Sequence, residues 1–320
     1  MRILICPLNW GLGHATRCVP IIHRHIAAGD EVVIASDGYP AAFLKQTFPA
    51  LKFFELPSYG VRYSSGKSQT FAMLANFPRI LKGIYTEHKW LKNLLQTEMF
   101  DIVISDNRFG LWNKAVESVY ITHQLMIKMP LGLKFLEPLV WLIHRFFISR
   151  YHQCWIPDME SPDNFSGDLS HAYPLPMNAR FIGILSRFEG LQHTKPNNEY
   201  HTVAVVSGLE PQRTLFLNSL IKEFENNPSK TLILSGQPRK QNEMTEIKAI
   251  INITIVSHLE DKALAAVLLG ASLIISRSGY SSIMDYLTLN VLHKVKLVPT
   301  PGQTEQMYLF QKYFSKTVGH

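Results

Sequence analysis

The chain has 320 residues, of which 46% are hydrophobic and 18% are charged, and it carries a formal net charge of +7. This length exceeds what one hydrophobic core usually covers, and the composition is far from that of a disordered chain, so we expect two folded domains. The basic excess is spread along the chain without a dense basic run. It therefore fits a phosphorylated ligand or an anionic membrane surface better than nucleic acid.

The cysteines, Cys6, Cys18 and Cys154, are far apart in the sequence and form no C-x-x-C pair. This pattern argues against a disulfide framework and a zinc site, and it is typical of a reducing compartment. The first apolar run, residues 3–8, is too short for a secretory signal, and charged residues interrupt the apolar stretch 131–148. We therefore expect a cytoplasmic protein that does not cross a membrane.

Short apolar runs alternate with longer stretches of helical periodicity along the whole chain. The runs are apolar nearly throughout, as in parallel strands buried on both faces, so the alternation indicates a βαβ array. The first series of predicted strands is 2–8, 31–36, 52–56, 102–105, 119–122, 154–156 and 181–184, with helices that include 15–28 and 70–98. The second series is 202–206, 231–235, 253–256, 273–276 and 296–298, with helices that begin near residues 211, 261, 281 and 304.

A polar segment, residues 186–200, separates the two series and contains glycine, proline and paired asparagines. This composition is typical of an interdomain linker. The predicted fold is therefore α/β, with two Rossmann-like, doubly wound domains in tandem, residues 1–185 and residues 201–320. Ligands bind beyond the carboxyl ends of the strands in such sheets, so we expect the two domains to face each other across a cleft.

The stretch ICPLNWGLGHATR, residues 5–17, joins the first predicted strand to the first helix. Gly11 and Gly13 allow tight backbone angles and the close approach of a ligand, as in a phosphate-binding turn. The dinucleotide-binding fingerprint is incomplete, because Thr16 stands where its third glycine would be. His14 is either a polar residue at a helix start or a general base at the mouth of the cleft.

Asp106 ends the predicted strand in the run DIVISD. An aspartate at this point commonly caps the following turn. The carboxyl ends of parallel strands meet at one edge of a sheet, so the alternative is that Asp106 orients His14.

The most specific stretch is LIISRSGYSSIMDYLTLN, residues 273–290, in which a strand runs through a glycine into a helix. Ser282 and Asp285 fit a capping box, which by itself only stabilises the helix start. The alternative is an anion site, because a basic side chain, a glycine, hydroxyls and a helix N-terminus converge here: Arg277, Ser278, Gly279, Ser281 and Ser282. In that case Asp285 would accept hydrogen bonds from ribose hydroxyls.

A second turn, VPTPGQTEQMYL (298–309), also leads from a strand into a helix. Gln303, Glu305 and Gln306 lie at the start of that helix. They are either favourable neighbours of a helix N-terminus or side chains that hold sugar hydroxyls.

These two C-terminal stretches resemble the donor site of GT-B glycosyltransferases, in particular the family 28-like enzymes of the MurG type. The GLGHATR turn is similar to the glycine–histidine turn of their first domain. The resemblance implies that Asp285 binds the ribose, that the nucleotide's diphosphate is held around Gly279, and that the donor sugar contacts the second turn. The full implied set is Arg277, Ser278, Gly279, Ser281, Ser282 and Asp285 for the nucleotide, and Gln303, Glu305 and Gln306 for the sugar.

The resemblance also implies that His14 is the general base on the acceptor, with Asp106 behind it. The turn residues near the phosphates are Gly11, Gly13, Ser207 and Gly208. On this basis the protein transfers a hexose or N-acetylhexosamine from a nucleotide sugar, with UDP as the expected nucleotide, to a lipid or saccharide acceptor with inversion. No metal and no further cofactor are expected, since the chain contains no D-x-D pair.

Two other functions share this architecture. A UDP-sugar epimerase would convert its substrate without an acceptor, and a non-catalytic protein would only bind the sugar nucleotide. A dehydrogenase is disfavoured by the incomplete fingerprint at Thr16.

Residues 131–152 predict a helix that is apolar around much of its circumference, in a region where lysine and arginine outnumber acidic residues. It is either a buried core helix or a surface helix that binds an anionic bilayer without spanning it. The resemblance to enzymes with a lipid acceptor favours the bilayer, and hence a place at the inner face of the membrane.

Overall fold

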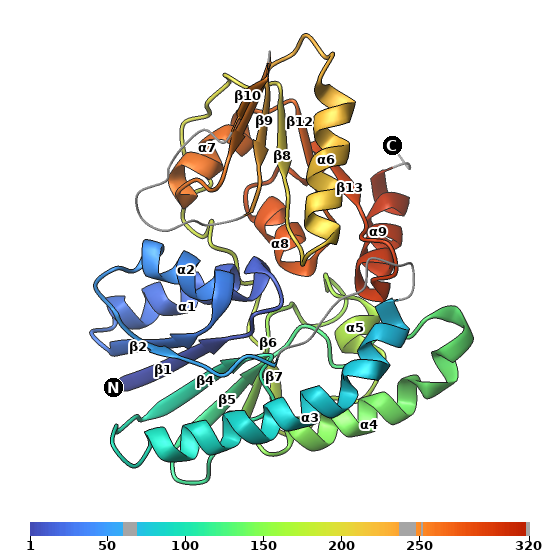
Figure 1. Ribbon diagram of the computed structural model, residues 1–320. Helices are drawn as coiled ribbons and strands as arrows, with labels where there is room; N and C mark the ends of the chain where they lie inside the picture. Colours follow the sequence, from blue (N-terminus) through green and yellow to red (C-terminus); the bar gives the residue numbers. More distant parts are fainter. Residues whose placement is uncertain (60–68, 237–247, 251, 318–320) are drawn as a thin grey trace.

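The structure is a computed structural model that describes residues 1–59, 69–236, 248–250 and 252–317. Its elements form an N-terminal half, β1 to β7, and a C-terminal half, β8 to β13 with α9. Figure 1 shows the two halves facing each other, with α1, α2 and the loops of the N-terminal half below α8. The predicted α/β fold with two Rossmann-like sheets is confirmed.

The N-terminal half contains, in chain order, β1 (Arg2–Pro7), α1 (Leu12–Ala27), β2 (Glu31–Ser36), α2 (Gly38–Thr47), β3 (Lys52–Glu55), α3 (Gln69–Leu94), β4 (Ile102–Asp106), β5 (Glu117–Ile121), the 3₁₀ helix η1 (Leu131–Leu136), α4 (Glu137–Ile148), β6 (Gln153–Ile156), α5 (Asp168–His171) and β7 (Ala179–Phe181). Its sheet has the order β3-β2-β1-β4-β5-β6-β7, and all of these strands are parallel.

The C-terminal half contains β8 (Thr202–Val205), α6 (Gln212–Phe224), β9 (Thr231–Leu234), β10 (Lys248–Ile250), β11 (Ile253–Val256), α7 (Asp261–Gly270), β12 (Leu273–Arg277), α8 (Tyr280–Thr288), the 3₁₀ helix η2 (Leu292–Lys294), β13 (Val295–Val298) and α9 (Thr304–Thr317). Its sheet has the order β10-β11-β9-β8-β12-β13, in which only the edge strand β10 is antiparallel among the described strands.

Both sheets reverse their strand order beside their first strand, between β1 and β4 in one and between β8 and β12 in the other. At such a point the two crossover connections leave in opposite directions and open a crevice at the carboxyl ends of the strands. The two crevices are the places where a ligand site is expected.

Each strand contributes side chains to two cores, which explains the continuous apolar runs in the sequence. In β1, Ile3 and Ile5 pack with α1 and α2, whereas Leu4 and Cys6 pack on the opposite face with Leu91 of α3. The C-terminal sheet is covered in the same way, by α7 and α8 on one face and by α6 on the other. Parallel sheets require this double cover because their crossover helices lie on both faces.

The segment between the halves, residues 186–200, is itself packed against the C-terminal half. Phe188 is buried in the core that α7 and α8 share, and the backbone N–H of Asn197 donates to the carbonyl of Ala266 at 2.9 Å. A further apolar cluster crosses between the halves, since Leu169 of α5 packs with Met284 of α8 and Leu309 of α9.

Three local expectations need correction. The strand expected at 181–184 lies earlier, at β7, and Gly183, with φ of 77°, leaves the extended backbone soon after its end. The capping box of Ser282 with Asp285 does not form, because α8 begins two residues earlier with Gly279 as its N-cap and no side-chain cap bond. The stretch 131–152 is not one helix but η1 followed by α4, because Pro138 suits the first turn of a new helix.

Candidate active site between the two halves

The predicted turn residues of both halves meet at the two strand-order reversals. Gly11 and Gly13 follow β1, Ser207 and Gly208 follow β8, and Gly279 follows β12. The hydroxyl of Ser281 on α8 donates to the carbonyl of Gly13 at 3.0 Å, and a β-carbon at Gly13 would lie only 3.2 Å from that hydroxyl oxygen. A side chain at position 13 would press on this hydroxyl, so glycine suits the close approach of α1 and α8 here.

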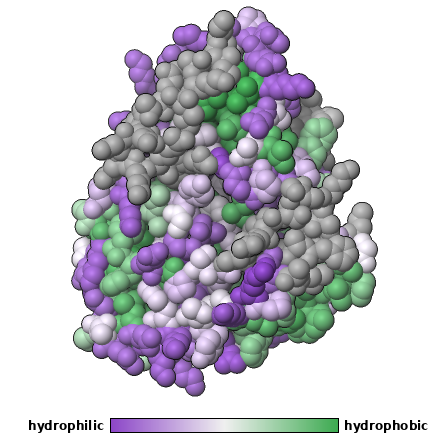
Figure 2. Space-filling model, in the orientation of Figure 1, coloured by the Kyte–Doolittle hydropathy of each residue, from purple (hydrophilic) through white to green (hydrophobic). Residues whose placement is uncertain are grey.

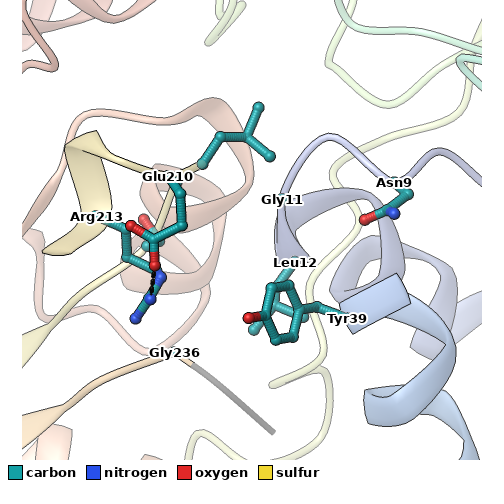
Figure 3. Close-up of a pocket in the computed structure, with 10 residues that line it drawn as sticks. Asn9, Gly11, Leu12, Tyr39, Glu210, Arg213 and Gly236 are labelled. Atoms are coloured by element: carbon teal, nitrogen blue, oxygen red, sulfur yellow. Dashed lines mark hydrogen bonds and ion pairs between the residues drawn. The ribbon is translucent and has the colours of Figure 1, made fainter. Parts of the chain in front are cut away.

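A pocket with about 400 Å³ of open space lies between the turn at Gly11 and the turn at Ser207 and Gly208, beside the contact of α1 with α8; His14, Asp106 and Gly279 are not among its lining residues. Figure 3 shows Asn9 and Tyr39 of the N-terminal half facing Glu210 and Arg213 of the C-terminal half, with the last two joined as an ion pair. Its full lining is Asn9, Gly11, Leu12, Tyr39, Ser207, Gly208, Leu209, Glu210, Arg213 and Gly236. The pocket lies at the carboxyl edge of both sheets, which is where folds of this class bind their ligands.

His14 and Asp106 are brought into direct contact. Nδ1 of His14, on the first turn of α1, lies 2.7 Å from a carboxylate oxygen of Asp106 at the end of β4. Burial by itself would raise the pKa of Asp106, but Arg17 and His14 beside it lower that pKa to about 2, so the group is a carboxylate. It accepts the Nδ1 proton of His14, which leaves Nε2 of the imidazole with its lone pair free to take a proton.

The side-chain contacts of Asp106 differ from those of a residue that caps a turn. The carboxylate is fully buried and contacts the side chains of His14, Arg17 and Cys18 rather than the turn that follows. The geometry is that of a residue that orients an imidazole.

Arg17 and His123 belong to the same cluster, although the sequence interpretation did not include them. Nε and Nη2 of Arg17 both donate to the carboxylate of Asp106, and Nη1 lies 2.6 Å from Nδ1 of His123. Nε2 of His123 lies 2.9 Å from a carboxylate oxygen of Glu305 on α9, and the imidazole stacks on the ring of Tyr280 with centroids 4.3 Å apart.

Two features of the sequence could have indicated these residues. Arg17 lies three positions after His14, which puts both on one face of a helix. His123 follows β5, the neighbour of β4, so it reaches the same sheet edge as Asp106.

The start of α8 supplies backbone groups and hydroxyls opposite this cluster. Gly279 is partly exposed, and a β-carbon there would meet nothing within 4 Å. Ser281 and Ser282 follow it on the first turn and are partly exposed, whereas the buried hydroxyl of Ser278 donates to the carbonyl of Gln306 at 2.8 Å. The first backbone N–H groups of a helix are unpaired within the helix and favour an anion.

The remaining predicted donor residues have partners within the protein. Asp285 accepts from the Ser186 hydroxyl at 2.6 Å and lies 3.5 Å from the guanidinium of Arg187; burial raises its pKa to about 6 although both neighbours oppose the shift. Arg277 donates to the carbonyls of Gln212 and Pro299 and lies over the ring of Phe216. Burial lowers the pKa of Arg277 to about 10. Neither residue lines the pocket.

On the second turn, the three residues that were predicted to contact the donor sugar have different partners. Glu305 points to His123, as described above. The side-chain oxygen of Gln306 accepts from the backbone N–H of Thr300 at 2.8 Å, so this side chain stabilises the turn. Gln303 is partly exposed, and its backbone N–H donates to the carbonyl of Thr300 at 3.1 Å.

Comparison with known proteins gives a family for the C-terminal half. Residues 202–320 match the family model described as the glycosyltransferase family 28 C-terminal domain. No curated protein sequence matches the chain.

Solved structures match the whole chain at low identity. The glycosyltransferase of kitacinnamycin is 15% identical with a TM-score of 0.57, over 98% of this chain and 84% of the other. A protein assigned as a UDP-N-acetylglucosamine 2-epimerase from Listeria monocytogenes is 9% identical with a TM-score of 0.56, over 100% and 90%. UGT2 of Phytolacca americana, solved with UDP-2-fluoro-glucose and pterostilbene, is 14% identical with a TM-score of 0.54, over 96% and 82%. At these identities the matches establish the shared fold.

Proposed function

We propose that this protein, a GT-B glycosyltransferase with a family 28 C-terminal domain, transfers a hexose or N-acetylhexosamine from UDP to a lipid or saccharide acceptor. The observation that carries the proposal is the contact between His14 and Asp106 at the crevice, directly opposite the start of α8. The proposed base of the N-terminal half, His14, thereby lies opposite the N-terminus of α8, which we propose binds the anionic diphosphate.

In this mechanism Nε2 of His14 takes the proton of an acceptor hydroxyl while that oxygen attacks the anomeric carbon of the donor sugar. The bond between the anomeric carbon and the diphosphate oxygen breaks, and its electron pair leaves with the nucleoside diphosphate. Attack opposite the leaving group inverts the configuration. Asp106 holds the imidazole by Nδ1 and so keeps Nε2 available for the acceptor proton.

The leaving diphosphate needs donors that are already in position. We place it between the Ser207–Gly208 turn and the start of α8, where Gly279 has no side chain and Ser281 and Ser282 lie on the first turn. Backbone N–H groups aimed at developing negative charge supply this stabilisation without rearrangement. Arg277 is not assigned this task, because its guanidinium is directed to backbone carbonyls.

Asp285 binds the ribose in this proposal. The ribose hydroxyls then replace the hydroxyl of Ser186 as hydrogen-bond donors to the carboxylate. Glu305 would reach the donor sugar from its position beside His123. Both carboxylates lie on the helices that border the crevice from the C-terminal half.

The acceptor is proposed to approach along α4, at the inner face of the membrane in the cytoplasm. The outer face of α4 carries apolar side chains that are 40–55% exposed, namely Leu139, Leu142, Ile143 and Phe146, and Phe135 of η1 before it is 74% exposed. Figure 2 shows hydrophobic residues gathered at the lower right of the molecule, where Figure 1 draws α4. Exposed Lys134, Arg145 and Arg150 border this face. No helix among the described residues is long and apolar enough to span a bilayer.

The test is a product search with the purified protein, UDP-sugars and either a lipid extract or oligosaccharides. Glycosyl transfer predicts that UDP release requires an acceptor and that a new glycoside of inverted configuration appears in the ¹H NMR spectrum. Conversion of the UDP-sugar to its epimer without any acceptor would favour the epimerase instead. Binding of nucleotide without either product would favour a non-catalytic role.

A further inference from the structure

Arg17 is buried at the centre of the cluster behind the proposed base, and only 2% of its side chain is exposed. Its planar guanidinium donates twice to the carboxylate of Asp106, and Nη2 also lies 3.1 Å from Nδ1 of His14. A bidentate contact of this kind neutralises a carboxylate more fully than a single hydrogen bond does. The carboxylate that would support an imidazolium is therefore already paired with a cation.

The third guanidinium nitrogen, Nη1, is held by His123. Because arginine only donates, Nδ1 of His123 must accept, and the ring proton is therefore on Nε2, which donates to Glu305. The stacking of His123 on Tyr280 fixes the plane of that ring. Glu305 and Tyr280 on the C-terminal half thus hold His123, and His123 holds Arg17 against Asp106.

We propose that Arg17 is a positioning residue for the base, and that its charge cancels that of Asp106 so that His14 rests as an uncharged imidazole. Only the effect of Arg17 on the pH profile of the reaction rests on the proposed function. The state of His14 itself can be measured without any substrate.

The charged and titratable groups that face His14 come from each element packed around it. Asp106 is on β4, Arg17 is on the same helix, His123 follows β5, and Glu305 is on α9. Burial lowers the pKa of His14, Asp106 raises it, and Arg17 and His123 lower it again, with a net downward direction. Without Arg17, the lowering by burial would be opposed by the full attraction of the Asp106 carboxylate, so the pKa of His14 would be higher than it is with Arg17 present.

The consequence for the reaction concerns the acidic side of the pH profile. A general base acts only in its uncharged form, so kcat/KM falls as the pH drops through the pKa of His14. With Arg17 present, activity extends to lower pH. Without it, His14 would already be protonated at a higher pH, and the acidic limb would move upward.

The first experiment is an NMR titration of the wild-type protein, with the His14 ring signal assigned by comparison with His14→Gln. We expect a midpoint below the ordinary value of about 6.5. A midpoint above that value would overturn the proposal, and this measurement requires no variant of Arg17 to fold.

The second experiment repeats the titration and the kcat/KM profile with Arg17→Gln. Both the His14 midpoint and the acidic limb should rise by about one unit or more, the usual effect of exposing a histidine to an unpaired carboxylate. Arg24→Gln is the matched control, because Arg24 is an exposed arginine near the other end of α1 that pairs with Glu189; it should change neither.

The failures of the two proposals are distinguishable. An unchanged His14 midpoint in folded Arg17→Gln would overturn the role of Arg17, whatever the protein catalyses. Normal turnover by a His14 variant would overturn the role of His14 as base, while the titrations would still report on Arg17.

Discussion

His14, on the first turn of α1, contacts a buried carboxylate while part of its side chain stays exposed. Its side chain is 13% exposed, with Nδ1 turned inward to Asp106. The contact with Asp106 fixes the proton on Nδ1. The proposed chemistry needs this contact as much as it needs Nε2, because a ring free to turn could carry its proton on Nε2 instead. His14 and Asp106 lie 92 positions apart in the chain, and the pairing of β1 with β4 brings their elements together.

The first residue-scale prediction is for His14→Ala. Loss of the base should lower turnover by about 100-fold or more and leave nucleotide affinity nearly unchanged, because the imidazole acts on the acceptor. Single-turnover rates and calorimetry of UDP binding measure the two effects. His23→Ala, an exposed histidine on the same helix, is the control. Normal turnover in His14→Ala would assign the proton transfer to another group.

The second concerns Asp285, whose present partners are Ser186 and Arg187. If ribose hydroxyls bind this carboxylate, Asp285→Ala should weaken UDP binding by about 1.5–3 kcal/mol, the usual contribution of hydrogen bonds to a charged group. Calorimetry on the folded variant measures this. Unchanged affinity with lower thermal stability would show that Asp285 only anchors the segment that joins the halves.

At the scale of elements, α4 leaves most of its apolar face uncovered. Only His144 and Ile148 of this helix are buried. Arg150 lies over the rings of Trp112 and Phe146, so a basic group borders the apolar face directly. This is the pattern of a helix that lies on an anionic bilayer.

We predict that the protein sediments with vesicles containing anionic lipid, less so at high salt, and little with neutral vesicles. Replacing Leu142 and Phe146 by serine should abolish sedimentation without unfolding the protein, because both side chains are more than half exposed. Phe147 is left in place, since it packs against Phe109. Leu215→Ser, an equally exposed residue on α6, is the control. A wild-type protein that stays in the supernatant with both vesicle types would indicate a soluble acceptor.

At the scale of the whole molecule, the two halves are joined by contacts well beyond the connecting segment. The hydroxyl of Tyr280 on α8 donates to the carbonyl of Pro157 at 2.6 Å, and Thr304 of α9 donates to the carbonyl of Lys128. Together with the pair of His123 and Glu305, these contacts fix the position of the proposed base, His14, relative to α8 and α9 of the C-terminal half. A change in how the halves pack would therefore change the site.

We predict that Tyr280→Phe lowers the free energy of unfolding by about 1–2 kcal/mol, because a buried carbonyl loses its donor. Urea unfolding followed by circular dichroism measures this. Tyr85→Phe, at an exposed tyrosine of α3, should have no effect. Equal stabilities of Tyr280→Phe and the wild type would show that this contact does not stabilise the packing of the halves.

The sequence by itself determined the α/β class, the two series of strands apart from the edge strand β10, and the residues at the carboxyl ends. This was possible because hydrophobic periodicity and glycine turns are local signals, and in a parallel sheet the strand ends share an edge. His14 and Asp106 could thus be expected near each other. Their contact, however, needed the strand order β1-β4, which no local pattern specifies.

Only the tertiary structure decided what the polar residues contact. By composition, Arg277 fits an anion site and Asp285 fits a ribose site. The packing of Phe216 and of the segment carrying Ser186, however, supplies both residues with partners inside the protein. Arg17 and His123 became visible only when α1, β5 and α9 were brought together. Whether α4 was a core or a surface helix was likewise undecided in the sequence, since an apolar helix becomes core only if another element covers it, and here its outer face stays exposed.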